Sequence, residues 1–170
     1  MVTIRLSDTE VDVAGIAGRL RHQQNREGNT TNYMDGVAEE EQIERDILGV
    51  KGELAFCKWA RTYPGCLTCH NRRLTHDGVA FGQRIDVKTR SWEEGLLEVR
   101  TNKQFSNTQV YVLIVGSKDD PAVFRLVGWA YAGDVYQPEN LRSYADGERF
   151  VMEQEDLRPM LELWERWGDD

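Results

Sequence analysis

The strongest continuous apolar run in the chain is Val110-Tyr-Val-Leu-Ile-Val115. A run of this length and composition is typical of a central β-strand that other layers cover on both faces. Asp119-Asp120-Pro121 is a turn signal between this run and a second candidate strand at 123–131, so we expect the two strands to form a hairpin. The sequence therefore predicts a sheet with a fully buried central strand.

Apolar residues recur at helical spacing both before and after a polar break at 27–32, and both of these segments precede the candidate strands. Ser7 or Asp8 can cap the first helix, and 170 residues is a usual size for a single domain, expected here to span 1–170. The expected helices are 8–26, 39–61 and 155–167, and the expected strands are 67–69, 79–81, 84–90, 96–100, 110–115 and 123–131, with a tight turn at Gly82-Gln83.

The segment Ile85-Asp86-Val87-Lys88-Thr89 combines strand alternation with two charged residues. Alternation places Asp86 and Lys88 on one face, with their Cα atoms about 7 Å apart. That spacing lets a divalent metal ion and an attacking water share the two side chains. Glu53 lies upstream beside the apolar stripe of the second expected helix, and Asp77 precedes Asp86 by nine residues. These four residues are candidates for one site.

The order of helix, strands, D-x-K strand and apolar strand resembles the PD-(D/E)XK nuclease superfamily. The matching positions are Glu53, Asp77, Asp86 and Lys88, although His76 stands where the family name places a proline. The resemblance implies an α/β fold with a restriction-endonuclease-like core at about 40–160, a central mixed β-sheet flanked by helices, and an extra N-terminal helix at about 8–26. Within the superfamily the chain looks most like small bacteriophage proteins of poorly defined function.

The resemblance also implies a chemistry, which is magnesium-dependent hydrolysis of phosphodiester bonds in DNA. Asp77, Asp86 and the Val87 carbonyl would hold Mg²⁺, for which Mn²⁺ can substitute, and Glu53 would contact the ion through water or hold a second one. Lys88 would orient or help deprotonate the attacking water. The catalytic set is thus expected to be Glu53, Asp77, Asp86 and Lys88. The sequence is compatible with endonuclease or exonuclease action, on DNA or RNA.

Other interpretations of the same residues remain open. The chain can be a nuclease-fold module without catalysis that binds nucleic acid or a host protein. Asp86 and Lys88 can form an exposed charge pair, Asp77-Gly78 can be an ordinary turn, and Glu53 can be a solvated helix residue. For Trp92 and Trp129, core packing is favoured over stacking on bases.

The three cysteines do not favour a disulfide framework, because their number is odd. Cys57, Cys66 and Cys69, with His70 or His76, offer enough ligands for a zinc or iron-sulfur site. Only Cys66 and Cys69 form a close pair, however, and a second such pair is missing from the sequence. A cysteine metal site is therefore not favoured.

The formal net charge of −8 argues against a protein that coats nucleic acid. Nevertheless, basic residues exceed acidic ones by nine to five at 58–103, so this segment carries +4 and the remainder −12. The local excess surrounds the candidate site and favours DNA as partner. No apolar run approaches the eighteen or so residues of a membrane span, and no secretory signal is evident, so we expect a cytoplasmic protein without a membrane partner, in the host cytoplasm if phage-encoded. Oligomeric state stays open, with a dimer among the options.

Overall fold

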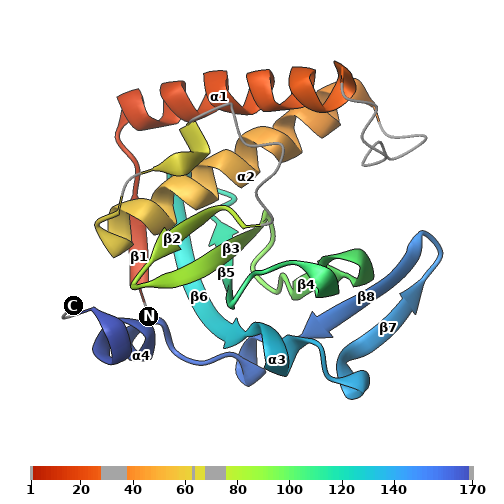
Figure 1. Cartoon of the computed structure of the whole chain (residues 1–170). Coiled ribbons are helices and arrows are strands. Elements are labelled where there is room, and N and C mark those ends of the chain that lie inside the picture. The colour runs from red at the N-terminus through yellow and green to blue at the C-terminus, as the bar shows by residue number, and fades with distance from the viewer. Residues whose placement is uncertain (1, 28–37, 63, 68–75, 169–170) are drawn as a thin grey trace.

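The computed structural model describes residues 2–27, 38–62, 64–67 and 76–168, which form a mixed α/β fold. Two long helices lie side by side over one face of a curled five-stranded sheet, and a three-stranded sheet packs against the opposite face (Figure 1). The strands are β1 (Val2–Arg5), β2 (Gly78–Ala80), β3 (Gln83–Arg90), β4 (Leu97–Arg100), β5 (Val110–Gly116), β6 (Val123–Tyr131), β7 (Leu141–Tyr144) and β8 (Gly147–Met152). The helices are α1 (Asp8–Glu27), α2 (Glu39–Ala60), α3 (Ala132–Val135) and α4 (Met160–Trp167), with 3-10 helices η1 (Gly65–Leu67), η2 (Thr101–Phe105), η3 (Pro138–Asn140) and η4 (Gln154–Asp156).

The larger sheet has the strand order β1-β6-β5-β3-β2 and is mixed. Strands β3 and β5 run parallel, with Asp86 opposite Tyr111 and Lys88 opposite Leu113. The remaining neighbours in this sheet are antiparallel, including the predicted hairpin of β5 and β6. Because a parallel pair needs a long crossover, the chain between β3 and β5 has room for β4 and η2. The crossover brings these two elements next to the D-x-K strand.

Strand β5 contributes to the core on both of its faces. Val110, Val112 and Ile114 pack with α1 and α2, whereas Tyr111 and Leu113 pack with β4 and β8 of the smaller sheet. All five side chains are fully buried. The prediction of a central strand covered on both faces is confirmed.

Two glycines let the layers approach closely. A Cβ atom at Gly18 would lie 2.6 Å from the Ile47 Cα, so α1 and α2 touch backbone to backbone there. A Cβ atom at Gly52 would lie 2.0 Å from the Thr89 Oγ1, so α2 rests directly on β3 at this point. Glu53 is thereby held next to the D-x-K strand.

Most predicted elements are present, with most bounds within one residue of those predicted, and three predictions need correction. Leu67 belongs to η1 rather than to a strand, and the rest of the predicted strand at 67–69 lies outside the described residues. The hairpin between β2 and β3 turns at Phe81-Gly82, where both residues have positive φ, instead of at Gly82-Gln83. Two consecutive left-handed residues match the right-handed twist of the flanking strands.

The C-terminal helix begins at Met160, not at residue 155. Pro159 stands just before it and disfavours helical backbone at Arg158, which instead pairs with Trp129 as an isolated β-bridge. Strands β1, β7 and β8 were not predicted. Of these, β7 is exposed along its length and carries no alternating burial pattern. None of the helices in the described part of the chain is long and apolar enough to cross a membrane.

Candidate functional site

Asp86 and Lys88 lie on the face of β3 that points away from α2. Asp86 is 1% exposed, and the ammonium group of Lys88 forms an ion pair with its Oδ1. The Lys88 Nζ also lies 5.7 Å from the ring centroid of Tyr111, the residue opposite Asp86 on β5. The interpretation of an exposed charge pair is therefore wrong, because Asp86 is buried. A buried carboxylate is costly without a partner, and Lys88 provides one.

Asp77 lies in a bend immediately before β2 and is bound to β3 through both its backbone and its side chain. Its N–H donates a hydrogen bond to the Ile85 carbonyl at 2.9 Å, and its Oδ2 accepts one from the Val87 N–H at 2.7 Å. These two bonds hold the carboxylate beside the D-x-K segment. Asp77 thus does more than form a local turn, since its side chain binds the backbone of β3.

Glu53 approaches the same region from α2 and is 6% exposed. Both of its carboxylate oxygens accept hydrogen bonds from the guanidinium group of Arg21 on α1, at 2.6 and 2.8 Å. The interpretation of Glu53 as a solvated helix residue is wrong. Arg21 was not anticipated, because it lies on a different helix and no local pattern links it to Glu53.

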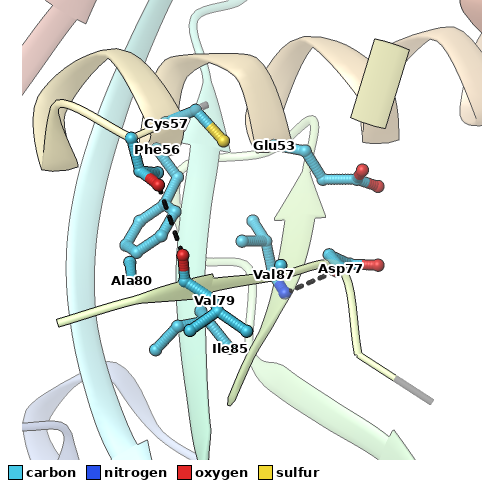
Figure 2. Close-up of a pocket in the computed structure, with 10 residues that line it drawn as sticks. Glu53, Phe56, Cys57, Asp77, Val79, Ala80, Ile85 and Val87 are labelled. Atoms are coloured by element: carbon cyan, nitrogen blue, oxygen red, sulfur yellow. Dashed lines mark hydrogen bonds between the residues drawn. The ribbon is translucent and has the colours of Figure 1, made fainter. Parts of the chain in front are cut away.

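The three carboxylates are close enough to influence one another electrostatically. Burial raises the pKa of Asp77 well above its usual range, and the negative charges of Glu53 and Asp86 raise it further. Figure 2 shows the Glu53 and Asp77 carboxylates at the same end of the pocket that they help to line. Burial lowers the pKa of Lys88, but the charges of Asp86, Asp77 and Glu53 outweigh this effect and leave that pKa raised. Lys88 is consequently protonated at neutral pH.

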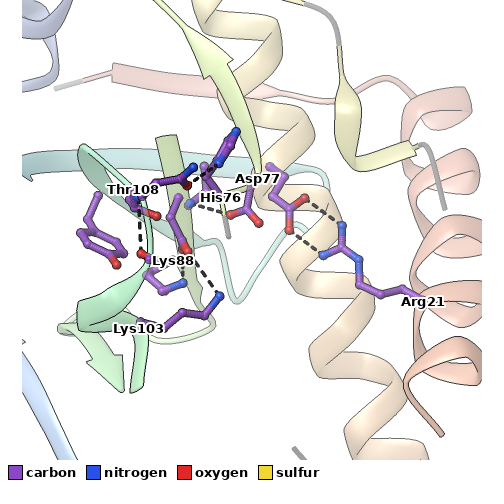
Figure 3. Close-up of polar contacts among 12 residues, drawn as sticks. Arg21, His76, Asp77, Lys88, Lys103 and Thr108 are labelled. Atoms are coloured by element: carbon purple, nitrogen blue, oxygen red, sulfur yellow. Dashed lines mark hydrogen bonds and ion pairs between the residues drawn. The ribbon is translucent and has the colours of Figure 1, made fainter. Parts of the chain in front are cut away.

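A second cation, Lys103, extends from η2 toward Asp86, with its Nζ 4.0 Å from Oδ2 (Figure 3). The D-x-K motif gives no indication of this residue. The basic excess at 58–103 is the sequence signal that includes it. Asp86 therefore lies between two ammonium groups, one from its own strand and one from the crossover.

The pocket between α2 and the β2–β3 hairpin is narrow. Its volume is about 10 Å³, close to the minimum that holds one water molecule. Apolar side chains such as Phe56 and Ile85 form most of its wall, and Cys57 is a free cysteine in the same wall. Cys69 and His70 lie outside the described residues, so the interpretation of a cysteine metal site stays a prediction.

The site offers only hard oxygen ligands, the type that Mg²⁺ prefers. Within residues 2–27, 38–62, 64–67 and 76–168, no three His, Cys, Asp or Glu side chains are grouped closely enough to hold a metal ion as they stand. Arg21 and Lys88 instead occupy oxygens of Glu53 and Asp86. The chemistry of the donors fits a divalent cation, and the mutual repulsion of the carboxylates around Asp77 favours one.

Replacement of Asp77 by Asn is expected to stabilise the protein at neutral pH. The native pKa of Asp77 is raised, so the native state binds more protons than the unfolded state between the two pKa values, and stability falls as pH rises through this window. Asn keeps an acceptor for the Val87 N–H and removes the charge. We expect a gain of about 0.5–2 kcal/mol in the free energy of urea unfolding at pH 7 in EDTA, the usual range for stabilising substitutions.

The matched control for this variant is Asp119→Asn, in the exposed turn between β5 and β6. It should leave the pH dependence of stability unchanged. A loss of stability in Asp77→Asn at pH 7 would show that the Asp77 charge is satisfied in the native state.

Comparison with protein-family models, with curated proteins and with solved structures gives no match to this chain. The resemblance to the PD-(D/E)XK superfamily therefore stays a prediction that depends on the residues themselves.

Proposed function

We propose that this protein is a magnesium-dependent DNA nuclease with a restriction-endonuclease-like core. The observation that carries the proposal is the convergence of Glu53, Asp77 and Asp86, from a helix, a bend and a strand, around a single lysine on that strand. Burial and the charges of Glu53 and Asp86 raise the pKa of Asp77, an unfavourable arrangement that a purely structural ion-pair network does not need. Carboxylates that lie close to one another beside a partly buried lysine are typical of sites that bind a cation or transfer protons.

Asp77, Asp86, the Val87 carbonyl and Glu53 would hold the metal ion. A divalent cation bound by such oxygens supplies charge neutralisation at a scissile phosphate and lowers the pKa of a bound water. The residues that neutralise these carboxylates here, Arg21 and Lys88, would then be released to contact other anions.

Lys88 has the properties of a charge stabiliser. In the protein without metal, the charges of Asp86, Asp77 and Glu53 raise the pKa of Lys88, so its ammonium group is protonated at neutral pH. A protonated lysine next to the scissile phosphate would stabilise the negative charge that develops in the transition state. We therefore assign Lys88 an electrostatic role and leave activation of the water to the carboxylates.

The test is cleavage of linear, nicked and branched DNA by the purified protein with Mg²⁺ or Mn²⁺. We expect cleavage that EDTA abolishes and that Asp86→Ala and Lys88→Ala reduce by about 10²-fold or more, as for other groups that stabilise transition-state charge. Lys118→Ala, an exposed lysine in the β5–β6 turn, is the matched control and should cleave normally. Equal cleavage by all four proteins would refute the proposal.

A second candidate is a nuclease-fold module that binds without catalysis. The ion pairs of Glu53 with Arg21 and of Asp86 with Lys88 favour it, because they leave these carboxylates already neutralised. A metal-binding nuclease gains about 2.7 kcal/mol of stability at a metal concentration 100 times the Kd. An unchanged Tm with Mn²⁺, together with absent cleavage, would favour the module.

A further inference from the structure

A hollow of about 360 Å³ next to the candidate site has a strongly basic wall. Its cationic side chains come from α2, β3, β4, η2 and β8, so five elements bring them together. The cationic residues that line it are Arg45, Lys88, Arg90, Arg100, Lys103 and Arg149. We call this hollow the basic groove.

Carboxylates only partly neutralise the basic groove. Glu98, which also lines it, is shared by Arg90 at 3.1 Å and Arg149 at 2.9 Å. Burial lowers the pKa of Arg90, and the nearby charge of Arg149 lowers it further against the effect of Glu98. Two guanidinium groups therefore compete for a single carboxylate at a site where all three side chains are at most 20% exposed.

Lys88 and Lys103 share the buried carboxylate of Asp86, whereas two acidic partners of the arginines lie toward solvent. Asp146 binds Arg149 and is 47% exposed, and Glu41 binds Arg45 and is 54% exposed. Exposed pairs of this kind are weak and screened by salt. A polyanion that replaces them would gain contacts with Arg149, which is 19% exposed, and with the more exposed Arg45. Arginine binds phosphate through paired N–H donors.

A second hollow of about 690 Å³ continues from the basic groove and shares Arg45, Arg90, Glu98 and Arg149 with it. This hollow extends to Trp92 and also includes Glu41 and Glu44. Its mixed charge makes it less suited to phosphate than the basic groove. An aromatic ring, in contrast, offers a surface for a base.

Trp92 is 45% exposed, contrary to the expectation of core packing, whereas Trp129 is fully buried as predicted. The loop that carries Trp92 is nevertheless held in place. Arg125 and Gln154 both donate hydrogen bonds to the Glu93 carbonyl, at 2.8 and 2.6 Å, and Gln154 also donates to the Gly95 carbonyl at 2.9 Å. The exposure of the ring is therefore a feature of an anchored loop.

We propose that the basic groove and the adjoining Trp92 bind single-stranded DNA, with phosphates along the groove and a base stacked on the Trp92 ring. Base stacking on aromatic side chains requires an unstacked base, which a single strand provides and a duplex does not. Lys88 lines the groove, so a strand bound there would pass one of the candidate catalytic residues. This inference rests on the proposed nuclease function and adds its substrate class.

The test is fluorescence anisotropy in EDTA with a labelled 15-nucleotide thymidine oligomer, the corresponding duplex and a uridine oligomer. We expect the single-stranded DNA to bind more tightly than the duplex. Trp92→Ala should weaken that binding about 5-fold or more, because stacking contributes at least this much, and Trp92→Phe should keep most of the affinity.

The basic groove is tested by the salt dependence of binding. Arg100→Gln should reduce the slope of log K against log salt concentration by about 0.7, the value for one phosphate contact on a single strand. Arg142→Gln is the matched control, because Arg142 lies on β7 of the same small sheet and does not line the groove. It should leave the slope unchanged.

Tighter binding of the duplex or of the uridine oligomer would overturn the proposal, as would unchanged affinity in Trp92→Ala. Because the assay contains no divalent cation, it is independent of cleavage. If the Trp92 and Arg100 variants change binding as expected but the protein cleaves no DNA, the groove is a binding site and the proposed nuclease function is wrong. If the protein cleaves DNA normally but neither variant changes binding, the nuclease function stands and the groove is not the binding site.

Discussion

Replacement of Lys88 by Met is expected to lower the free energy of unfolding by about 3 kcal/mol, the lower end of the cost of breaking a buried ion pair. The reason is that Asp86 is almost fully buried and, among the residues that the structure describes, would keep Lys103, at 4.0 Å, as its remaining ion-pair partner. The expected cost is at the lower end of this range because the Lys88 side chain is itself 24% exposed. Met retains the length and apolar stem of lysine, so the effect reports the charge. Urea unfolding at pH 7 measures it.

A double variant separates this charge effect from packing. Asp86→Asn removes the buried carboxylate, so Asp86→Asn with Lys88→Met should be about 2 kcal/mol more stable than Lys88→Met alone, a coupling within the usual range for residues in contact. Equal stability of the single and double variants would mean that the ion pair contributes little. Both variants should lack cleavage activity, because each loses Lys88.

Replacement of Gly52 by Ala is expected to destabilise the protein by about 2–3 kcal/mol, near the upper end for overpacking a core. The added Cβ would lie 2.0 Å from the Oγ1, 2.7 Å from the Cγ2 and 2.9 Å from the Cβ of Thr89. Rotation of the Thr89 side chain does not remove a contact with its Cβ, so α2 must move away from β3. That movement would also displace Glu53 from Asp77, so the proposed metal binding should weaken along with stability.

Gly49→Ala is the matched control, since Gly49 lies three residues earlier on α2 with nothing within 4 Å of an added Cβ. It should stabilise the protein by up to about 1 kcal/mol, because alanine is the better helix former. The double variant Gly52→Ala with Thr89→Ala should recover much of the loss, since it removes the two closest atoms. A thermal unfolding series measures all three, and a neutral Gly52→Ala would contradict the close approach of α2 and β3.

The hydrophobic pattern alone was sufficient to predict the main helices and the central strands. Side chains of the apolar run at 110–115 are buried on both faces of the sheet. Every position in the run is therefore apolar, whichever layer covers it, and the strand can be recognised from the sequence. Alternation likewise placed Asp86 and Lys88 on the face opposite Val87. The edge strand β7, with exposed side chains along its length, carries no such pattern and was missed.

The sequence by itself therefore determined the main helices, the central strands and the placement of Asp86 beside Lys88, because these depend on spacings of two to four residues along the chain. Only the tertiary structure decided which distant charges meet. Arg21 contacts Glu53 across two helices, Lys103 reaches Asp86 through the crossover, and Arg149 shares Glu98 with Arg90. Such contacts depend on how layers pack and leave no local periodicity in the sequence. The D-x-K segment could thus be found from its residues, whereas the charges around it could not.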